Sequence, residues 1–158
     1  MKKHLSTLLL AGAMAMTSLA HGAASLSVTA PWVRATVPAQ KSTGAFMHVQ
    51  SAVPARLVGV SSPIAATVEL HQMKMSGTTM KMARVEGIDL PAGKGVNLAS
   101  GGYHIMLMGL TRQLQEGEAI DLTLRVQSKG KKIENITVKV PVKPMTFVSP
   151  GQAGHMGH

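Results

Sequence analysis

Apolar and polar residues alternate with a period of two along most of the chain, in short runs separated by Gly, Pro and Ser. Such alternation is typical of antiparallel strands that bury one face. The pattern predicts strands near residues 26–29, 32–35, 44–51, 56–61, 68–75, 80–85, 95–98, 103–109, 119–127 and 132–140. Many short strands without an internal repeat favour an all-β sandwich in a single domain.

The two ends of the chain do not follow this pattern. Lys2 and Lys3 precede an apolar run over residues 5–20, and small residues follow it, so residues 1–24 are predicted to be a signal peptide. Cleavage fits after residue 22, 23 or 24, and the last is favoured. The run is shorter than the roughly 20 residues that cross a bilayer, and the chain has no cysteine to accept a lipid. We therefore expect export into the periplasm without stable membrane insertion.

The rest of the chain divides into a domain over residues 25–146 and a glycine-containing tail over residues 147–158, which is predicted to be flexible. Loss of Lys2 and Lys3 lowers the formal net charge of +9 by two. The remaining basic residues are spread along the domain without interleaved aromatic residues, so nucleic acid is not an expected partner. A solvated basic face is the simplest interpretation, and docking to acidic partners or anionic membrane surfaces is the alternative.

Methionine is unusually frequent, with 12 residues in 158. If Met75 pairs with Met80 across a turn, then Met73 faces Met82 and His71 faces Arg84. Strand alternation places the histidine and these four methionines on one face. His71 and Met82 are then diagonal neighbours, about 7 Å apart at Cβ. Met73, directly opposite Met82, is an alternative ligand.

A third strand carries the same residue types. His104, Met106 and Met108 share one face of it, and Tyr103, Ile105 and Leu107 share the other. A metal ion held between this strand and the hairpin would have four ligands from two distant segments. These predicted ligands are His71, Met82, His104 and Met106.

The ligand types indicate the metal. Thioether sulfur is soft and neutral, and together with imidazole it suits Cu(I) rather than zinc, calcium or magnesium. A blue-copper centre needs a cysteine thiolate, and the chain has none. Methionine also fills irregular cores, and we assign Met47 and Met145 to that role. The clustered methionines are different, because a buried neutral histidine among them would find few hydrogen-bond partners.

The spacing His71, ten residues, Met82, twenty-one residues, His104, one residue, Met106 resembles the motif of the periplasmic PCu(A)C (DUF461-type) copper chaperones. The segments VELHQMKM, MKM and GGYHIMLMGL also fit, as do the earlier PWVR and TGAF. The resemblance covers residues 25–146. Gln72 departs from the hydrophobic or Met residue that many members have there, which leaves the four ligands unaffected.

The resemblance implies a cupredoxin-like Greek-key sandwich or barrel that binds Cu(I) near its surface. It also implies an acceptor, the dinuclear copper centre of cytochrome c oxidase, sometimes together with a Sco-type protein. Some members have His- and Met-containing extensions that resemble Cu(II) sites. By that comparison His155, Met156 and His158 in the tail are auxiliary ligands, and a tail with incidental histidines is the alternative.

Three functions are compatible with these residues. The first is a monomeric copper carrier without catalytic turnover. The second is a copper buffer or resistance protein, which would bind further copper through methionines outside the main site (Met73, Met75, Met80 and Met108). The third, a copper oxidoreductase, is disfavoured because no catalytic acid or base is expected near the ligands.

Overall fold

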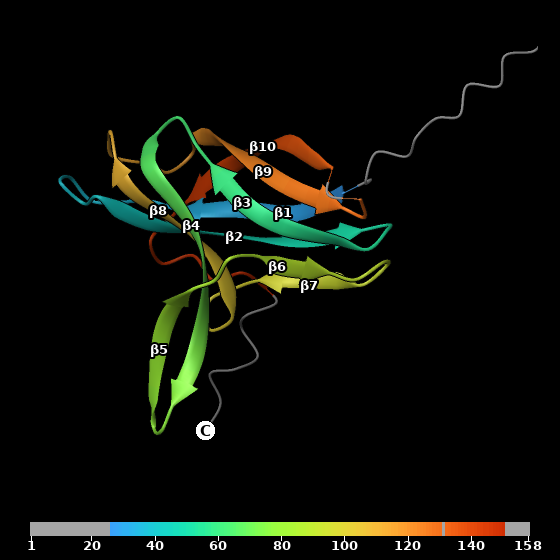
Figure 1. Cartoon of the computed structure of the whole chain (residues 1–158). Coiled ribbons are helices and arrows are strands. Elements are labelled where there is room, and N and C mark those ends of the chain that lie inside the picture. Colours follow the sequence, from blue (N-terminus) through green and yellow to red (C-terminus); the bar gives the residue numbers. More distant parts are fainter. Residues whose placement is uncertain (1–25, 131, 151–158) are drawn as a thin grey trace, which may run out of the picture.

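In a computed structural model, the residues described are 26–130 and 132–150 (Figure 1). These ranges contain strands and no helix, and therefore no helix long and apolar enough to cross a membrane. The strands are β1 (Leu26–Arg34), β2 (Ser42–Ser51), β3 (Ala55–Ser61), β4 (Ala65–Ser76), β5 (Thr79–Arg84), β6 (Ile88–Leu90), β7 (Gly95–Leu98), β8 (Tyr103–Leu110), β9 (Ala119–Ser128) and β10 (Ile133–Lys143).

All ten strands belong to one hydrogen-bonded sheet. Its order is β5-β4-β8-β7-β2-β1-β10-β9-β3-β6, so β5 and β6 lie at the two ends, and β8 also pairs with β2. Neighbouring strands run antiparallel except for β1 with β10 and β7 with β8. The all-β fold class predicted from the alternation is confirmed.

One hydrophobic core lies inside this sheet. Ile105 and Leu107 of β8 belong to the same buried cluster as Leu122 and Leu124 of β9, although several strands separate β8 from β9 in the sheet order. Such strands can share a core only if the sheet folds over on itself. Along β9 the buried side chains alternate with more exposed ones, as the period of two predicts.

Strand β1 corrects the prediction of two separate strands at residues 26–29 and 32–35. The chain continues as one strand through Pro31, with a register shift against β2 between Thr29 and Trp32. Ala30 takes a positive φ of 48° at this point. The irregularity is a β-bulge, which interrupts the alternation without ending the strand.

Strand β6 was not predicted. It has only three residues, which is too short for a period of two to be visible, and it pairs with β3 at the end of the sheet. Ile88 and Leu90 are almost completely buried there. Through these two side chains β6 contributes to the hydrophobic core next to β3.

The two methionines assigned to core packing differ in burial. Met47 is 2% exposed, which confirms its assignment, whereas Met145 is 49% exposed, and its assignment is wrong. Met145 follows the last strand and lies outside the core. Its backbone carbonyl accepts a hydrogen bond of 2.7 Å from Nη1 of Arg34.

The first residues of the predicted tail contact the domain. Phe147 packs edge-on against Trp32, with 4.9 Å between ring centroids, and Lys143 lies over its ring. The signal peptide over residues 1–24 and the tail residues His155, Met156 and His158 fall outside the described ranges, so these predictions stay predictions.

Strand β4 is shared between two partners. Its residues 65–72 pair with β8, and its residues 71–76 pair with β5. The second half of β4 and the whole of β5 form a hairpin that projects from the body of the protein (Figure 1). His71 and Gln72 are the residues of β4 that have a register partner on both sides.

Candidate metal centre

His71 and His104 are brought together where β4 changes partners. His71 is the direct register partner of His104 on β8 and of Arg84 on β5. Direct partners project to the same face of a sheet. The two imidazole rings accordingly lie with their centroids 5.8 Å apart, at an angle of 72°.

The hairpin register agrees with the prediction. Met73 pairs with Met82, and Met75 pairs with Met80. Because alternate residues share a face, these four methionines lie on the same face as His71. The side chain of Met82 is 51% exposed.

Met106 reaches this face from β8, two residues beyond His104. Its register partner on β4 is Glu69. A pocket of about 330 Å³ is lined by Met73, Met82, His104 and Met106, together with Arg34, Gly44, Phe46, Ser100 and Gly101. Three of the four predicted ligands therefore line one pocket. His71 does not line it and lies beside His104 instead.

The orientation of His71 is set by a carboxylate that the sequence analysis missed. Nε2 of His71 lies 2.8 Å from Oε2 of Glu69, so the neutral ring donates its Nε2 proton to the carboxylate. Nδ1 is buried and has no hydrogen-bond partner among the described residues. A buried lone pair without a partner is costly. A metal ion bound at Nδ1 would satisfy it, with the carboxylate orienting the ligand from behind.

Glu69 is itself held in place. Its side chain is 20% exposed, and its second oxygen lies 3.7 Å from Nη1 of Arg84. The signal that would have found Glu69 was available, because it precedes His71 by two residues and so shares its face.

His104 is the more buried of the two histidines, with 6% of the residue exposed. Its Nδ1 lies 3.2 Å from the carbonyl oxygen of Gly102 and donates to it, which leaves the lone pair on Nε2. Burial lowers the pKa of His104 below its ordinary value of 6.5, and the nearby His71 lowers it further, against the opposing effect of the hydrogen bond to Gly102. The ring is thereby kept neutral, as metal binding requires.

These two hydrogen bonds correct one argument made from sequence. We expected a neutral histidine among thioethers to find few partners, yet each ring has one partner, Glu69 or Gly102. Each ring still keeps one nitrogen without a proton. Both rings can therefore still bind a metal ion through that nitrogen. The expectation that the rings lack hydrogen-bond partners fails for the other nitrogen of each ring.

The donor set around the pocket is soft and poor in carboxylates. The described residues contain no group of three or more His, Cys, Asp or Glu side chains that could hold a metal ion. Arg34 lines the pocket and also lies over the ring of Trp32, 5.3 Å from its centroid. A fixed positive charge beside neutral ligands disfavours a divalent ion more than a monovalent one.

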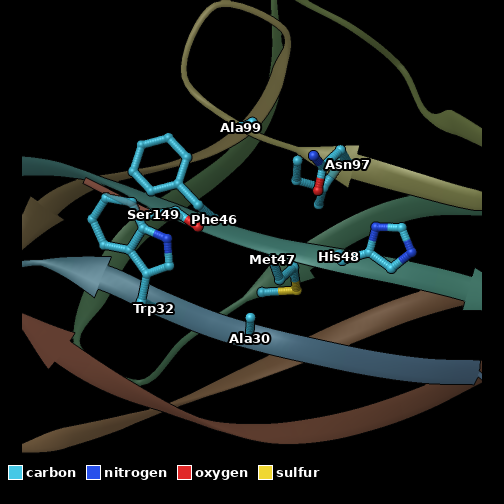
Figure 2. A pocket seen from close by; sticks show the side chains of 9 residues that line it. Ala30, Trp32, Phe46, Met47, His48, Asn97, Ala99 and Ser149 are labelled. Carbon is cyan, nitrogen blue, oxygen red and sulfur yellow. The ribbon is translucent and has the colours of Figure 1, made fainter. Parts of the chain in front are cut away.

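Aromatic residues form one wall of this region. Trp32 and Phe46 lie side by side, 4.5 Å apart at their centroids, and Figure 2 shows them at one end of a small pocket of about 70 Å³. On its other side Phe46 lies near His104, with 6.5 Å between the two ring centroids. His48 lies at the other end of that small pocket (Figure 2). Its ring fills the space that a side chain at Gly95 would take. His48 therefore has a packing role.

The sequence matches a known protein family and one of its relatives. The model of the LpqE-like family, described as "Putative lipoprotein LpqE-like", matches residues 26–142. A relative from Leifsonia xyli subsp. xyli (strain CTCB07), named "Putative lipoprotein Lxx21020", is 35% identical over 133 residues. That match covers 82% of this chain and 76% of the relative.

Solved structures share the fold. The copper-bound PCuAC domain from PmoF2 is 26% identical and superposes with a TM-score of 0.62, covering 78% of this chain and 97% of that domain. Cu(I)-bound DR1885 from Deinococcus radiodurans is 30% identical with a TM-score of 0.54, covering 76% and 77% of the two chains. The resemblance to PCu(A)C proteins is confirmed, and so is the cupredoxin-like fold. The chain belongs to the LpqE-like family.

Proposed function

We propose that this protein is a copper carrier that binds one Cu(I) ion through His71, Met82, His104 and Met106 and transfers it to an acceptor protein. The observation that carries the proposal is the direct cross-strand pairing of the two histidines, each with a ring nitrogen free of protons, beside a thioether-lined pocket. Two similar structures are described as copper-bound, which supports the choice of metal.

The donor set suits a carrier. Four neutral ligands leave the bound ion with its single positive charge, and soft thioethers favour Cu(I) over Cu(II). The buried His104 and the partly buried His71 hold the ion, while the exposed Met82 can be displaced by an incoming ligand. Transfer by ligand exchange changes no oxidation state and requires no catalytic group, so we propose no enzymatic activity.

The affinity of the site is tested by competition. Reduced full-length protein is titrated with Cu(I) against a chromophoric chelator, in parallel with a Met82→Leu, Met106→Leu double variant. Leucine keeps the apolar volume but removes the sulfur, so we expect the affinity to fall at least about tenfold, or about 1.4 kcal/mol. The matched control is Met108→Leu, also on β8 but outside the pocket. Equal affinity in the double variant and the control would contradict the ligand assignment.

The acceptor that we propose is the dinuclear copper centre of cytochrome c oxidase, with a Sco-type protein as the second partner in the transfer. This follows from the resemblance to PCu(A)C chaperones. The test is transfer of Cu(I) to a purified oxidase copper domain, followed by oxidation and measurement of the absorbance of the dinuclear centre, with and without residues 149–158. Whether His155, Met156 and His158 bind Cu(II) stays a prediction, which a separate Cu(II) titration of the full-length and truncated proteins tests.

We place this carrier in the periplasm as a monomer. The support is the apolar segment near the N-terminus and the family description as lipoproteins. The sequence has no cysteine to which a lipid could be attached, so attachment through a thioether is not proposed. Cell fractionation and size-exclusion chromatography test these two points.

The alternative is a copper buffer without a dedicated acceptor. The observation in its favour is the number of exposed thioethers on the projecting hairpin, where Met75 and Met80 are 63% and 45% exposed. A buffer predicts no transfer to the oxidase domain in the experiment above and no oxidase defect when the protein is deleted.

A further inference from the structure

We propose that Met73, Met75 and Met80 form a second, weaker Cu(I) site on the projecting hairpin, from which the ion passes to the histidine-containing site. This inference rests on the proposed copper-binding function and extends it with an entry site made of thioethers alone.

The register places three sulfurs within reach of one ion. Met75 and Met80 are direct partners across β4 and β5, and Met73 lies two residues from Met75 on the same face. Direct partners are about 4.5–5.5 Å apart at Cβ, and a step of two residues along a strand is about 7 Å. Methionine has three rotatable bonds and a polarizable sulfur, so the thioethers can converge from these positions.

Burial of core surface does not explain these residues. Met75 is 63% exposed and Met80 is 45% exposed, whereas Met47 in the core is 2% exposed. Cross-strand pairs that stabilise a hairpin are commonly aromatic, β-branched or oppositely charged. This hairpin instead has two successive Met–Met pairs on one face. Large exposed apolar side chains grouped in this way usually mark a binding site.

The surroundings select the kind of ion. On the other face of the hairpin Lys74 pairs directly with Lys81, so positive charge lies on both strands. The carboxylate of Glu69 is already engaged by His71 and Arg84. Neutral soft donors near positive charge disfavour divalent hard ions and favour a soft monovalent ion, namely Cu(I) or its surrogate Ag(I).

The position of Met73 links the two sites. It pairs with Met82 and lines the same pocket as His104 and Met106. An ion that leaves Met75 and Met80 can keep its bond to Met73 while it gains Met82 and then the imidazoles. Over the whole transfer the three copper–sulfur bonds to Met75, Met80 and finally Met73 break, and four bonds form, to Met82, Met106, His71 and His104, so the coordination number rises from three to four. The ion remains Cu(I), and no proton or electron is transferred.

The experiment separates the two sites in the full-length chain. A main-site variant, His71→Gln with His104→Gln and Met106→Leu, is compared with a combined variant that also carries Met73→Leu, Met75→Leu and Met80→Leu. We expect the main-site variant to bind about one Cu(I) at least tenfold more weakly than the unaltered protein, with only sulfur ligands in the copper X-ray absorption spectrum. The combined variant is expected to lose this ion. The tail is present in both, so any contribution from it cancels.

A measurement on the unaltered protein guards against misfolding of the variants. The methionine methyl NMR signals are followed during addition of Ag(I), with Met75→Leu and Met80→Leu single variants for assignment. We expect the Met75 and Met80 signals to shift after those of Met82 and Met106 are saturated.

Equal copper binding by the main-site and combined variants, together with unshifted Met75 and Met80 signals, would overturn the inference. It would assign the exposed methionines to contact with a partner protein instead. The tight site of the unaltered protein would then still support the proposed function. Absence of tight binding in the unaltered protein would contradict the proposed function itself.

Discussion

Two positions on β4, His71 and Met75, differ in what surrounds the side chains that we propose as copper ligands. His71 is flanked by β5 and β8, and its partner His104 is only 6% exposed. Met75, four residues further along, has one neighbouring strand, β5, and is 63% exposed. One face of this sheet therefore has a largely buried pair of imidazoles beside exposed thioethers. In the proposed carrier the first would set the affinity for copper and the second its access.

The largest expected effect is on copper affinity, and it follows from substitution of Glu69. Replacement by Ala removes the carboxylate that orients His71, and loss of such a partner typically costs about tenfold or more in metal affinity. We expect the tight site to weaken by about that factor and the hairpin site to be unchanged, as measured by chelator competition. Glu69→Gln keeps an oxygen acceptor and should lose less.

The control for this prediction is Glu86→Ala, because Glu86 is an exposed carboxylate just beyond β5. Equal effects of the Glu69 and Glu86 substitutions would mean that only the general charge matters, and that His71 does not depend on a specific partner.

A second prediction concerns pH in the metal-free protein. The folded pKa of His104 lies below 6.5, mainly because the ring is buried, so the unfolded chain binds more protons than the folded chain between that pKa and 6.5. Stability therefore rises with pH across this window and falls as the pH decreases through it. Urea unfolding at several pH values checks the direction.

The prediction is contradicted if the free energy of unfolding does not change with pH in the unaltered protein. It is also contradicted if the same change remains in a His104→Gln variant. Either result would mean that the second histidine gives the fold no pH dependence, and that its burial does not act on its charge.

The smallest expected effect is in the hairpin. Lys74→Glu replaces a direct pair of like charges with a pair of opposite charges, and such pairs contribute roughly 0.2–1 kcal/mol. We expect slower hydrogen exchange of the β5 amides and an unchanged tight copper affinity. Ser76→Glu, nearer the turn and opposite Thr79, is the matched control for added negative charge. Equal protection in both variants would contradict the pairing argument.

The hairpin was the most predictable part of the molecule. Its register, with Met73 opposite Met82 and Met75 opposite Met80, follows from one short turn and the period of two. The all-β class was predictable for the same reason. These features depend on residues that are close in sequence.

Long-range pairing was less predictable. The sequence predicted that His71 and His104 would bind one metal ion. Their direct pairing depends on β4 and β8 being neighbours, which the sheet as a whole determines. Glu69 was not predicted because a carboxylate is a poor ligand for Cu(I), and its contact with His71 is visible only once the side chains are placed. Met145 was misassigned because composition does not indicate whether a residue after the last strand reaches the core.

The exposure of Met75 and Met80 also has a chemical consequence. Thioethers are converted to sulfoxides by peroxide, and accessible ones react first. A sulfoxide is polar and is no longer a soft sulfur donor. Met82 is exposed to a similar degree, at 51%, so oxidation should reach one thioether of the proposed tight site together with those of the hairpin. The two imidazoles would remain, and the oxidised protein should hold copper more weakly.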